Sequence, residues 1–309
     1  MVEQRNKIIQ LKSKSFFFAL SIICAVPLLY VIYKAFTNSF THDESFSYNY
    51  YVNTSVWDII TYKGPDIPNS HILNTLLMKF SQALFGSSEF ALRLPNVIAY
   101  CTYIIFSLLW LRKFNNGFLL ITGFIILNYN PFILDFFALA RGYGLAICCM
   151  FISFYFFYNL VSSLKTKNVL LSFTFAALAV WSNFTLLNYY IGLFITYNFL
   201  LAFNSFKAKA TASATIRNLF IRNIPSLGVT VILAAVIITP LKVIKGNLFG
   251  HFEGFYENTM RSLAEATVQN QEHNIITILC IFAFTVVISL LFIIKCTYRN
   301  INNKYSLTL

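Results

Sequence analysis

The chain has 309 residues, of which 58% are hydrophobic and 11% are charged, whereas soluble proteins carry about 25% charged residues. This composition excludes an ordinary soluble domain and predicts an integral membrane protein. The net charge is +12, but the basic residues form short clusters between apolar runs, so the charge indicates membrane topology and not nucleic-acid binding.

Apolar runs long enough to cross a bilayer follow one another along the whole chain. They predict about eight transmembrane helices, at residues 15–36, 93–111, 117–134, 142–161, 169–187, 189–204, 224–244 and 274–295. The first run follows a basic segment, as a signal peptide does, but its length favours a retained anchor. We therefore expect an all-α polytopic protein in which residues 1–309 form a single membrane domain.

The basic residues that flank these runs set the expected orientation. If the N-terminus is cytoplasmic, most Lys and Arg residues lie on the cytoplasmic face, and every acid except Glu3 lies on the other. Both termini are then cytoplasmic. Residues 37–92 and 246–273 become two large loops on the extracytoplasmic face of the cell or inner membrane.

The first outer loop, residues 37–92, is too long to be a simple connection. Ser55 and Asp58 form an S-x-x-D capping signal for a short helix. From about residue 70, apolar residues recur at spacings of three and four with polar residues opposite, and Gly86 follows as a helix C-cap. This pattern predicts an amphipathic helix that lies in the membrane interface.

Charged residues gather at the same predicted membrane surface. Asp43 and Glu44 directly follow the first span, where ionisable groups need a partner or a task. The same face is expected to hold Asp66, His71, Arg93, Arg141, Lys242 and Lys245. Such a set suits a reaction at a lipid phosphate, because a carboxylate can orient or deprotonate an acceptor hydroxyl while cations hold the phosphate.

Four motifs give the chain a resemblance to a known family. They are H-D-E at 42–44, S-H-I-L-N at 70–74, L-F-G-S-S-E-F-A-L-R-L-P at 84–95 and A-R-G-Y-G-L at 140–145. Together they resemble the C-type glycosyltransferases of family 39, which include protein O-mannosyltransferases and aminoarabinose transferases, over about residues 10–245. The chain departs from that group in reading S-H-I-L-N in place of an H-P-P form, and in having fewer spans.

The resemblance implies a polyprenyl-phosphate-linked sugar donor and an acidic motif in the first outer loop. Asp43 would be the catalytic carboxylate with Glu44 beside it, and Arg141 would bind the donor phosphate. Lys242 and Lys245 are further candidates for the phosphate, and Asp66, His71 and Arg93 for other roles in the site. Asp43, Asp66 and His71 leave a divalent cation open.

Each candidate also has a structural interpretation. Arg93 has Glu89 four residues before it, which suits a helix ion pair, and Arg141 has Asp135 nearby in the turn. Lys242 and Lys245 can act as snorkelling membrane anchors. Among the cations, Arg141 is the expected partner of Asp43.

The sequence thus predicts a membrane glycosyltransferase that moves a sugar from a polyprenyl-phosphate donor to a hydroxyl acceptor. Its partners would be the lipid-linked donor and membrane lipids. Two alternatives stay open: a transporter or flippase of a lipid-linked or anionic substrate, and a truncated, non-catalytic relative. The sugar, the acceptor, any metal and the oligomeric state are not specified by the sequence.

Overall fold

The computed structural model describes residues 2–63, 71–209, 211–244 and 283 of the chain. The chain divides into two compact units, residues 1–248 and 249–309, and the first is described below. Within the described residues every regular element is a helix. The predicted outer loop 246–273 and nearly all of the predicted span 274–295 lie outside the described residues.

Five helical segments are long and apolar enough to cross a membrane. They are Phe16–Thr37, Glu89–Phe114, Gly142–Val161, Phe184–Lys207 and Ala212–Lys242. These segments correspond to the predicted spans 15–36, 93–111, 142–161, 189–204 and 224–244. The prediction of an all-helical fold is confirmed for the described residues, and the five long apolar helices are of the kind that integral membrane proteins have. The count of eight spans stays a prediction.

Two other predicted spans have a different form in the structure. The span 117–134 is a broken pair, α6 (Gly117–Asn128) and α7 (Pro131–Phe137), with a bend of 64° between its halves. The span 169–187 corresponds to α9 (Thr166–Ser182), which has 17 residues. It ends early because Asn183 is extended and its side chain accepts a hydrogen bond from the Thr185 amide at 3.0 Å, which starts a new turn.

The remaining elements complete the chain order. The long helices are α1 (Val2–Thr37), α5 (Glu89–Leu111), α8 (Gly142–Ser162), α10 (Leu187–Lys207) and α11 (Ala212–Ile244). The short ones are α2 (His42–Ser47), α3 (Val56–Ile60), α4 (Ile72–Phe85), a π-helical turn η1 (Tyr48–Val52) and 3-10 turns η2 (Arg112–Phe114) and η3 (Phe184–Leu186).

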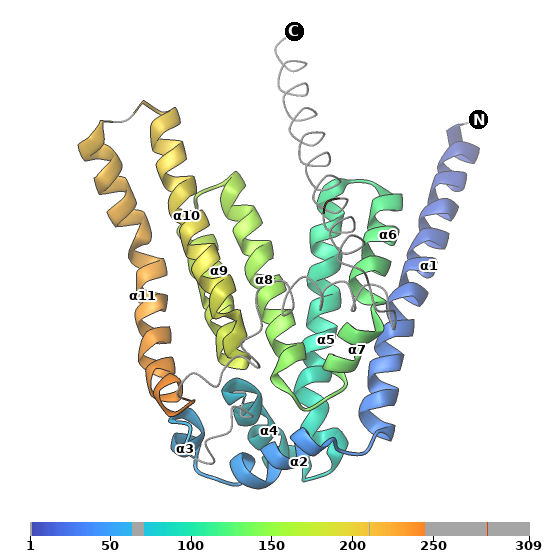
Figure 1. The fold of residues 1–309 in the computed structure, drawn as a ribbon. Helices are drawn as coiled ribbons and strands as arrows, with labels where there is room; N and C mark the ends of the chain where they lie inside the picture. Colours follow the sequence, from blue (N-terminus) through green and yellow to red (C-terminus); the bar gives the residue numbers. More distant parts are fainter. Residues whose placement is uncertain (1, 64–70, 210, 245–282, 284–309) are drawn as a thin grey trace. The chain divides into compact units, whose positions relative to one another are not determined.

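The long helices have two distinct ends (Figure 1). We call the loop end the one where α2, α3 and α4 lie, together with α7 and the first residues of α5 and α8. The far end carries the short connections between α5 and α6, between α8 and α9, and between α10 and α11. Asp43 and Arg141, which are 98 positions apart, therefore lie at the same end.

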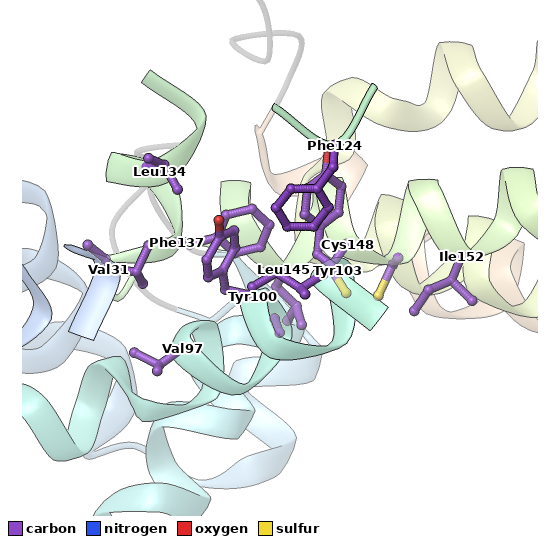
Figure 2. Close-up of a cluster of buried hydrophobic side chains, with 14 of the residues drawn as sticks. Val31, Val97, Tyr100, Tyr103, Phe124, Leu134, Phe137, Leu145, Cys148 and Ile152 are labelled. Carbon is purple, nitrogen blue, oxygen red and sulfur yellow. The ribbon is translucent and has the colours of Figure 1, made fainter. Parts of the chain in front are cut away.

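Apolar side chains of α1, α5, α6, α7 and α8 meet in one core (Figure 2). The rings of Tyr100 and Tyr103 on α5 have centroids 4.9 and 5.4 Å from that of Phe137 on α7. Aromatic pairs at such separations add to the burial of their area. The core thus fixes α7, and with it the turn that leads into α8 and carries Arg141.

The break between α6 and α7 is built from specific polar contacts. Asn130 caps α7 by accepting from the amides of Phe132 and Ile133, and Pro131 starts the helix without needing an amide partner. At the end of α6, the hydroxyls of Tyr103 and Tyr100 donate to the carbonyls of Leu127 and Asn128 at 3.1 and 3.2 Å. Buried carbonyls are therefore satisfied at the bend.

Helices α8 and α9 approach each other closely through small residues. The Ser153 hydroxyl donates to the Ser172 carbonyl at 2.7 Å, and the Ser172 hydroxyl donates to the Ser153 carbonyl at 3.0 Å. Ala176 and Ala179 on α9 are fully buried. Small residues and reciprocal hydroxyl bonds are how helices associate where lipid gives no hydrophobic driving force.

Helix α4 turns its polar residues inward and its large apolar residues outward. Asn74, Thr75 and Ser81 are buried, whereas Phe80 and Leu84 are 62% and 59% exposed. The Ser81 hydroxyl donates to the carbonyl of Ala91 at 2.5 Å, a group that loses its helical partner because Pro95 has no amide hydrogen. The apolar surface of α4 suits contact with lipid instead of water.

Candidate active site

Asp43 and Glu44 occupy the first turn of α2, whose start is fixed by Thr41. The Glu44 amide donates to the Thr41 hydroxyl at 3.3 Å, and the Thr41 amide donates to a Glu44 carboxylate oxygen at 2.9 Å. Thr41 and Glu44 thus form the T-x-x-E capping box. Because consecutive helical residues point about 100° apart, Glu44 faces the protein while Asp43 faces the surface.

The Glu44 carboxylate forms a buried, two-point ion pair with Arg93 on α5. Arg93 Nε donates to Oε1 of Glu44 and Nη2 donates to Oε2, both at 2.9 Å. The Ala140 amide adds a further bond to Oε1 at 2.6 Å, and both side chains have no exposed surface. One carboxylate therefore joins α2, α5 and the turn before α8.

Arg93 also holds the end of α1. Its Nη1 donates to the carbonyls of Ala35 and Asn38, and its Nη2 donates to that of Ser39 at 3.1 Å. With the two bonds to Glu44, all five guanidinium hydrogens have acceptors. The predicted neighbour on its own helix, Glu89, is at 3.9 Å from Nη1 and 46% exposed, so it is a secondary contact.

These contacts give Glu44 and Arg93 a structural role. Burial raises the pKa of the Glu44 carboxyl, but the bonds from Arg93, Ala140 and Thr41 outweigh it, so that the pKa is below its usual range. A carboxylate with four donors and no exposed surface offers no oxygen to a substrate. We therefore revise the predicted catalytic role of Glu44, and the signal that indicates its structural role is the T-x-x-E pattern at 41–44.

Asp43 and Arg141 form another ion pair at the loop end. Arg141 Nη2 is 3.2 Å from Oδ2 of Asp43, whose side chain is 55% exposed against 8% for Arg141. The expected partnership of these two residues is present. The alternative partner of Arg141 was Asp135, but that carboxylate accepts instead from the Tyr30 hydroxyl at 3.1 Å and lies 3.7 Å from Lys34 Nζ.

Arg141 has a fixed position at the start of α8. It is the residue immediately before the first helical turn, and its guanidinium lies over the ring of Tyr143, 5.6 Å from the centroid. The N-terminal end of a helix carries partial positive charge. The guanidinium and the helix end therefore favour an anion at the same place.

His71 packs behind Arg141, against Gly142. A Cβ atom at Gly142 would lie 2.0 Å from the carbonyl oxygen of Ser182 and 2.6 Å from Cβ of His71, so only glycine fits between α4 and α9 here. The His71 residue is half-buried, and its ring centroid is 5.0 Å from that of Tyr143. Its Nε2 is buried and has no hydrogen-bond partner among the described residues.

The surroundings of His71 keep its ring neutral. Burial, and next the positive charge of Arg141, lower the pKa of His71 to about 3, against an opposing hydrogen bond with the Ser182 backbone. A neutral imidazole is a packing element beside Gly142 and Tyr143 and not a cation for a phosphate.

Two buried asparagines tie the turn before α8 to α4 and α5. Asn74 Nδ2 donates to the Ala140 carbonyl at 3.0 Å, and Asn96 Nδ2 donates to Asn74 Oδ1 at 2.7 Å. The Leu145 amide donates to Asn96 Oδ1 at 3.0 Å. Asn74 ends the S-H-I-L-N motif at 70–74, but neither asparagine was a predicted site residue, because neither is charged and they are 22 positions apart. They position residues 140–145 and so Arg141.

An apolar groove lies beside this network, between α4, α5 and α8. Its volume is about 320 Å³. Its walls include Phe80 and Phe85 of α4, Pro95 of α5, and Leu145 and Cys148 of α8. Leu145 is four residues after Arg141, which is about 6 Å along a helix. The groove therefore begins about one helical turn from the residue that pairs with Asp43.

The structure says less about the other predicted site residues. Lys242 is exposed near the end of α11 at the loop end (Figure 1), and its part in the site stays a prediction. Asp66 and Lys245 lie outside the described residues. In the part of the chain that the structure describes, no group of three or more His, Cys, Asp or Glu residues is arranged to hold a metal ion.

Comparison of the chain with protein-family models, with curated proteins and with solved structures found no match.

Proposed function

We propose that this protein is a membrane glycosyltransferase that moves a sugar from a polyprenyl-phosphate donor to a hydroxyl acceptor. One observation carries the proposal: the half-exposed Asp43 carboxylate pairs with the nearly buried Arg141 at 3.2 Å, and the helix that Arg141 begins also lines an apolar groove. The proposal takes this acid, this cation and the apolar groove as parts of one site.

The proposed roles of Arg141, the groove and Asp43 follow from their charge and exposure. Arg141, backed by the N-terminus of α8, binds the phosphate of the donor through charge-assisted hydrogen bonds. The lipid chain lies in the groove between α4, α5 and α8. Asp43 is the group left to meet the acceptor, because its side chain is exposed while Glu44 is enclosed.

The proposed reaction is a single displacement at the anomeric carbon. The acceptor oxygen forms a bond to this carbon, and the bond from the carbon to the phosphate oxygen breaks. The acceptor proton passes to the Asp43 carboxylate, and the electron pair of the broken bond leaves with the polyprenyl phosphate. Arg141 stabilises the charge that grows on this leaving group.

Donor binding also changes the partner of Asp43 in this proposal. Before binding, the Arg141 guanidinium holds the Asp43 carboxylate at 3.2 Å. A donor phosphate competes for the same guanidinium, and the carboxylate oxygen then becomes available to the acceptor hydroxyl. Acceptor activation would therefore follow donor binding.

The membrane arrangement belongs to the same proposal. We place the loop end outside and both termini in the cytoplasm, with eight spans, since basic residues favour the cytoplasmic side. Helices α3 and α4 would lie in the membrane interface. The exposed Trp57 of α3 and Phe80, Leu84 and Phe85 of α4 support this, because each has more than half of its surface exposed.

The test is transfer and donor binding by the purified full-length protein in proteoliposomes. With a panel of polyprenyl-phosphate hexoses and pentoses, we expect release of polyprenyl phosphate that Asp43→Asn slows by about 100-fold or more. Arg141→Lys keeps the charge and should weaken binding of polyprenyl phosphate, measured by thermal shift. The control is Asn53→Ala, an exposed residue of the same loop, which should leave both readouts unchanged.

Two results would overturn the proposal. One is wild-type transfer by a correctly inserted Asp43→Asn protein. The other is movement of intact donor across the bilayer without release of polyprenyl phosphate, which would identify a flippase.

A further inference from the structure

A second hollow lies at the far end of the protein, away from the candidate active site. Its volume is about 460 Å³, and its walls come from the α8–α9 connection, α9, α10 and α11. The walls include Leu164, Thr166, Tyr197, Asn218, Arg222 and Pro225. Unlike the groove at the loop end, this hollow has a cation, an amide and two hydroxyl side chains in its lining.

Hydrogen bonds between helices fix the shape of this hollow. Arg222 Nη1 on α11 donates to the carbonyl of Leu164 at 3.2 Å, and the Tyr197 hydroxyl on α10 donates to the carbonyl of Arg222 at 2.8 Å. Asn223 Nδ2 donates to Asn198 Oδ1 at 2.8 Å. The Arg222 carbonyl, the Arg222 guanidinium and the Asn223 side chain are therefore each held by a bond to another segment, and the guanidinium is positioned at the wall.

Among the described residues, the charged side chains at the hollow are basic. Arg222 lines it, Lys165 lies between the lining residues Leu164 and Thr166, and Lys167 follows them. Residues 136–252 contain no Asp or Glu. With no acid in this stretch to neutralise them, these cations favour a negatively charged ligand.

The same pair of helices offers an apolar surface next to the hollow. A second space of about 230 Å³ lies between α9 and α11, lined by Ala177, Leu178 and Trp181 on one side and Val229, Leu233 and Val236 on the other. Val229 follows Pro225 of the first hollow by one helical turn. A ligand with an anionic head and an apolar chain can therefore contact both.

We propose that the far end binds one anionic phospholipid, with its phosphate on Arg222 and an acyl chain along α9 and α11. The combination favours a lipid over a free phosphate, since the apolar space begins about one helical turn along α11 from the cationic hollow. Basic pockets between membrane helices are typical sites for anionic headgroups. This site does not depend on the proposed transferase activity.

The experiment compares two lipids with identical chains on the purified full-length protein. Dioleoyl phosphatidylglycerol or dioleoyl phosphatidylcholine is titrated into detergent micelles, and binding is followed by native mass spectrometry and thermal shift. We expect phosphatidylglycerol to bind at least tenfold more tightly. Arg222→Gln should weaken its binding about fivefold or more, and Arg222→Lys less.

Two further variants test whether phosphatidylglycerol binds at this site and not elsewhere on the protein. Arg217→Gln removes the same charge from the same helix outside the hollow, and it should change binding less than twofold. Ala177→Phe fills the apolar space and should weaken phosphatidylglycerol while leaving Arg222 in place. Equal effects of Arg222→Gln and Arg217→Gln would overturn the proposal, because they indicate a diffuse charge effect. So would equal binding of the two lipids, or the same stabilisation by glycerol 3-phosphate alone.

Discussion

Asp43 and Glu44 are adjacent in sequence but differ in every physical respect that matters for chemistry. Glu44 is fully buried and accepts hydrogen bonds from Arg93, Ala140 and Thr41. Asp43 is 55% exposed, and Nη2 of Arg141 lies 3.2 Å from its Oδ2. Each carboxylate has an arginine, yet only the Asp43 pair has surface on which a substrate can act.

The difference shows how one motif can serve two purposes. A buried ion pair costs free energy to desolvate, and it is retained where many hydrogen bonds satisfy it. The Glu44–Arg93 pair meets this condition and joins α1, α2, α5 and the turn before α8. The residues of the Asp43–Arg141 pair belong to α2 and to the turn before α8, two of the segments that the Glu44–Arg93 pair joins. Variants of the two pairs should therefore separate stability from activity.

The largest expected effect comes from Arg93→Ala. This change leaves the Glu44 carboxylate buried without its main partner and removes the donors to the α1 carbonyls. We expect the free energy of unfolding to fall by about 3–5 kcal/mol, measured by thermal or denaturant unfolding in detergent.

A double variant tests whether the pair acts as a unit. Glu44→Gln with Arg93→Met removes both charges, and it should cost less than the sum of the two single changes, because no isolated charge stays buried. Additive costs would show that the two side chains stabilise the protein independently.

The next largest effect is expected for Gly142→Ala, beside Arg141. The added methyl would lie 2.0 Å from the Ser182 carbonyl oxygen, and overpacking of this kind costs about 1–3 kcal/mol. Gly192→Ala on α10 is the matched control, since its new Cβ meets nothing within 4 Å. A drop in melting temperature for both variants alike would mean that the contact at Gly142 is not the cause.

A pH effect is expected from His71. Its pKa in the folded protein, about 3, is below the ordinary value of 6.5, so the unfolded chain takes up a proton that the folded one does not. Stability is then complete above about pH 6.5 and falls toward pH 3, by up to about 1.4 kcal/mol per pH unit. Melting at pH 7.5 and 5.5 measures the difference.

Two variants test this pH effect through the change in stability between the two pH values, and not through the absolute stability. His71→Gln should remove most of the drop between pH 7.5 and 5.5, even if it destabilises the protein at both values. His42→Gln removes an exposed histidine of the same loop and should keep the drop of the wild-type protein. A pH dependence that survives His71→Gln would assign it to another group.

The smallest effect on stability is expected for Asp43→Asn. Exposed ion pairs contribute less than about 1 kcal/mol, so unfolding should hardly change while transfer is lost. A loss of stability as large as that of Arg93→Ala would contradict the distinction between the two pairs.

Much of the fold was predictable because every helix that crosses a bilayer needs about 20 mostly apolar residues in succession. Five apolar runs became helices long enough to cross a membrane, and Ser55 and Gly86 mark helix ends as their residue types indicate. The Asp43–Arg141 pair was also predicted, since topology placed both residues at one surface. The proposed activity itself stays a prediction.

The rest depends on contacts between distant residues, which local patterns do not encode. Arg93 was expected to pair with Glu89 at helical spacing, but Glu44 is 49 positions away and offers two oxygens at 2.9 Å. Likewise, α4 was predicted as an amphipathic interfacial helix, and no partner was predicted for its polar residues. In the structure, Asn74 and Ser81 find Asn96 and Ala91 on α5.

The inward polar face of α4 also bears on biogenesis. The groups that satisfy Asn74 and Ser81 belong to residues 91, 96 and 140, which are synthesised after α4 itself. Until they arrive, α4 presents unsatisfied polar atoms on one side and large apolar residues on the other. Its docking must therefore wait for α5 and the start of α8, and we expect a nascent chain that ends before residue 140 to expose α4 to proteases.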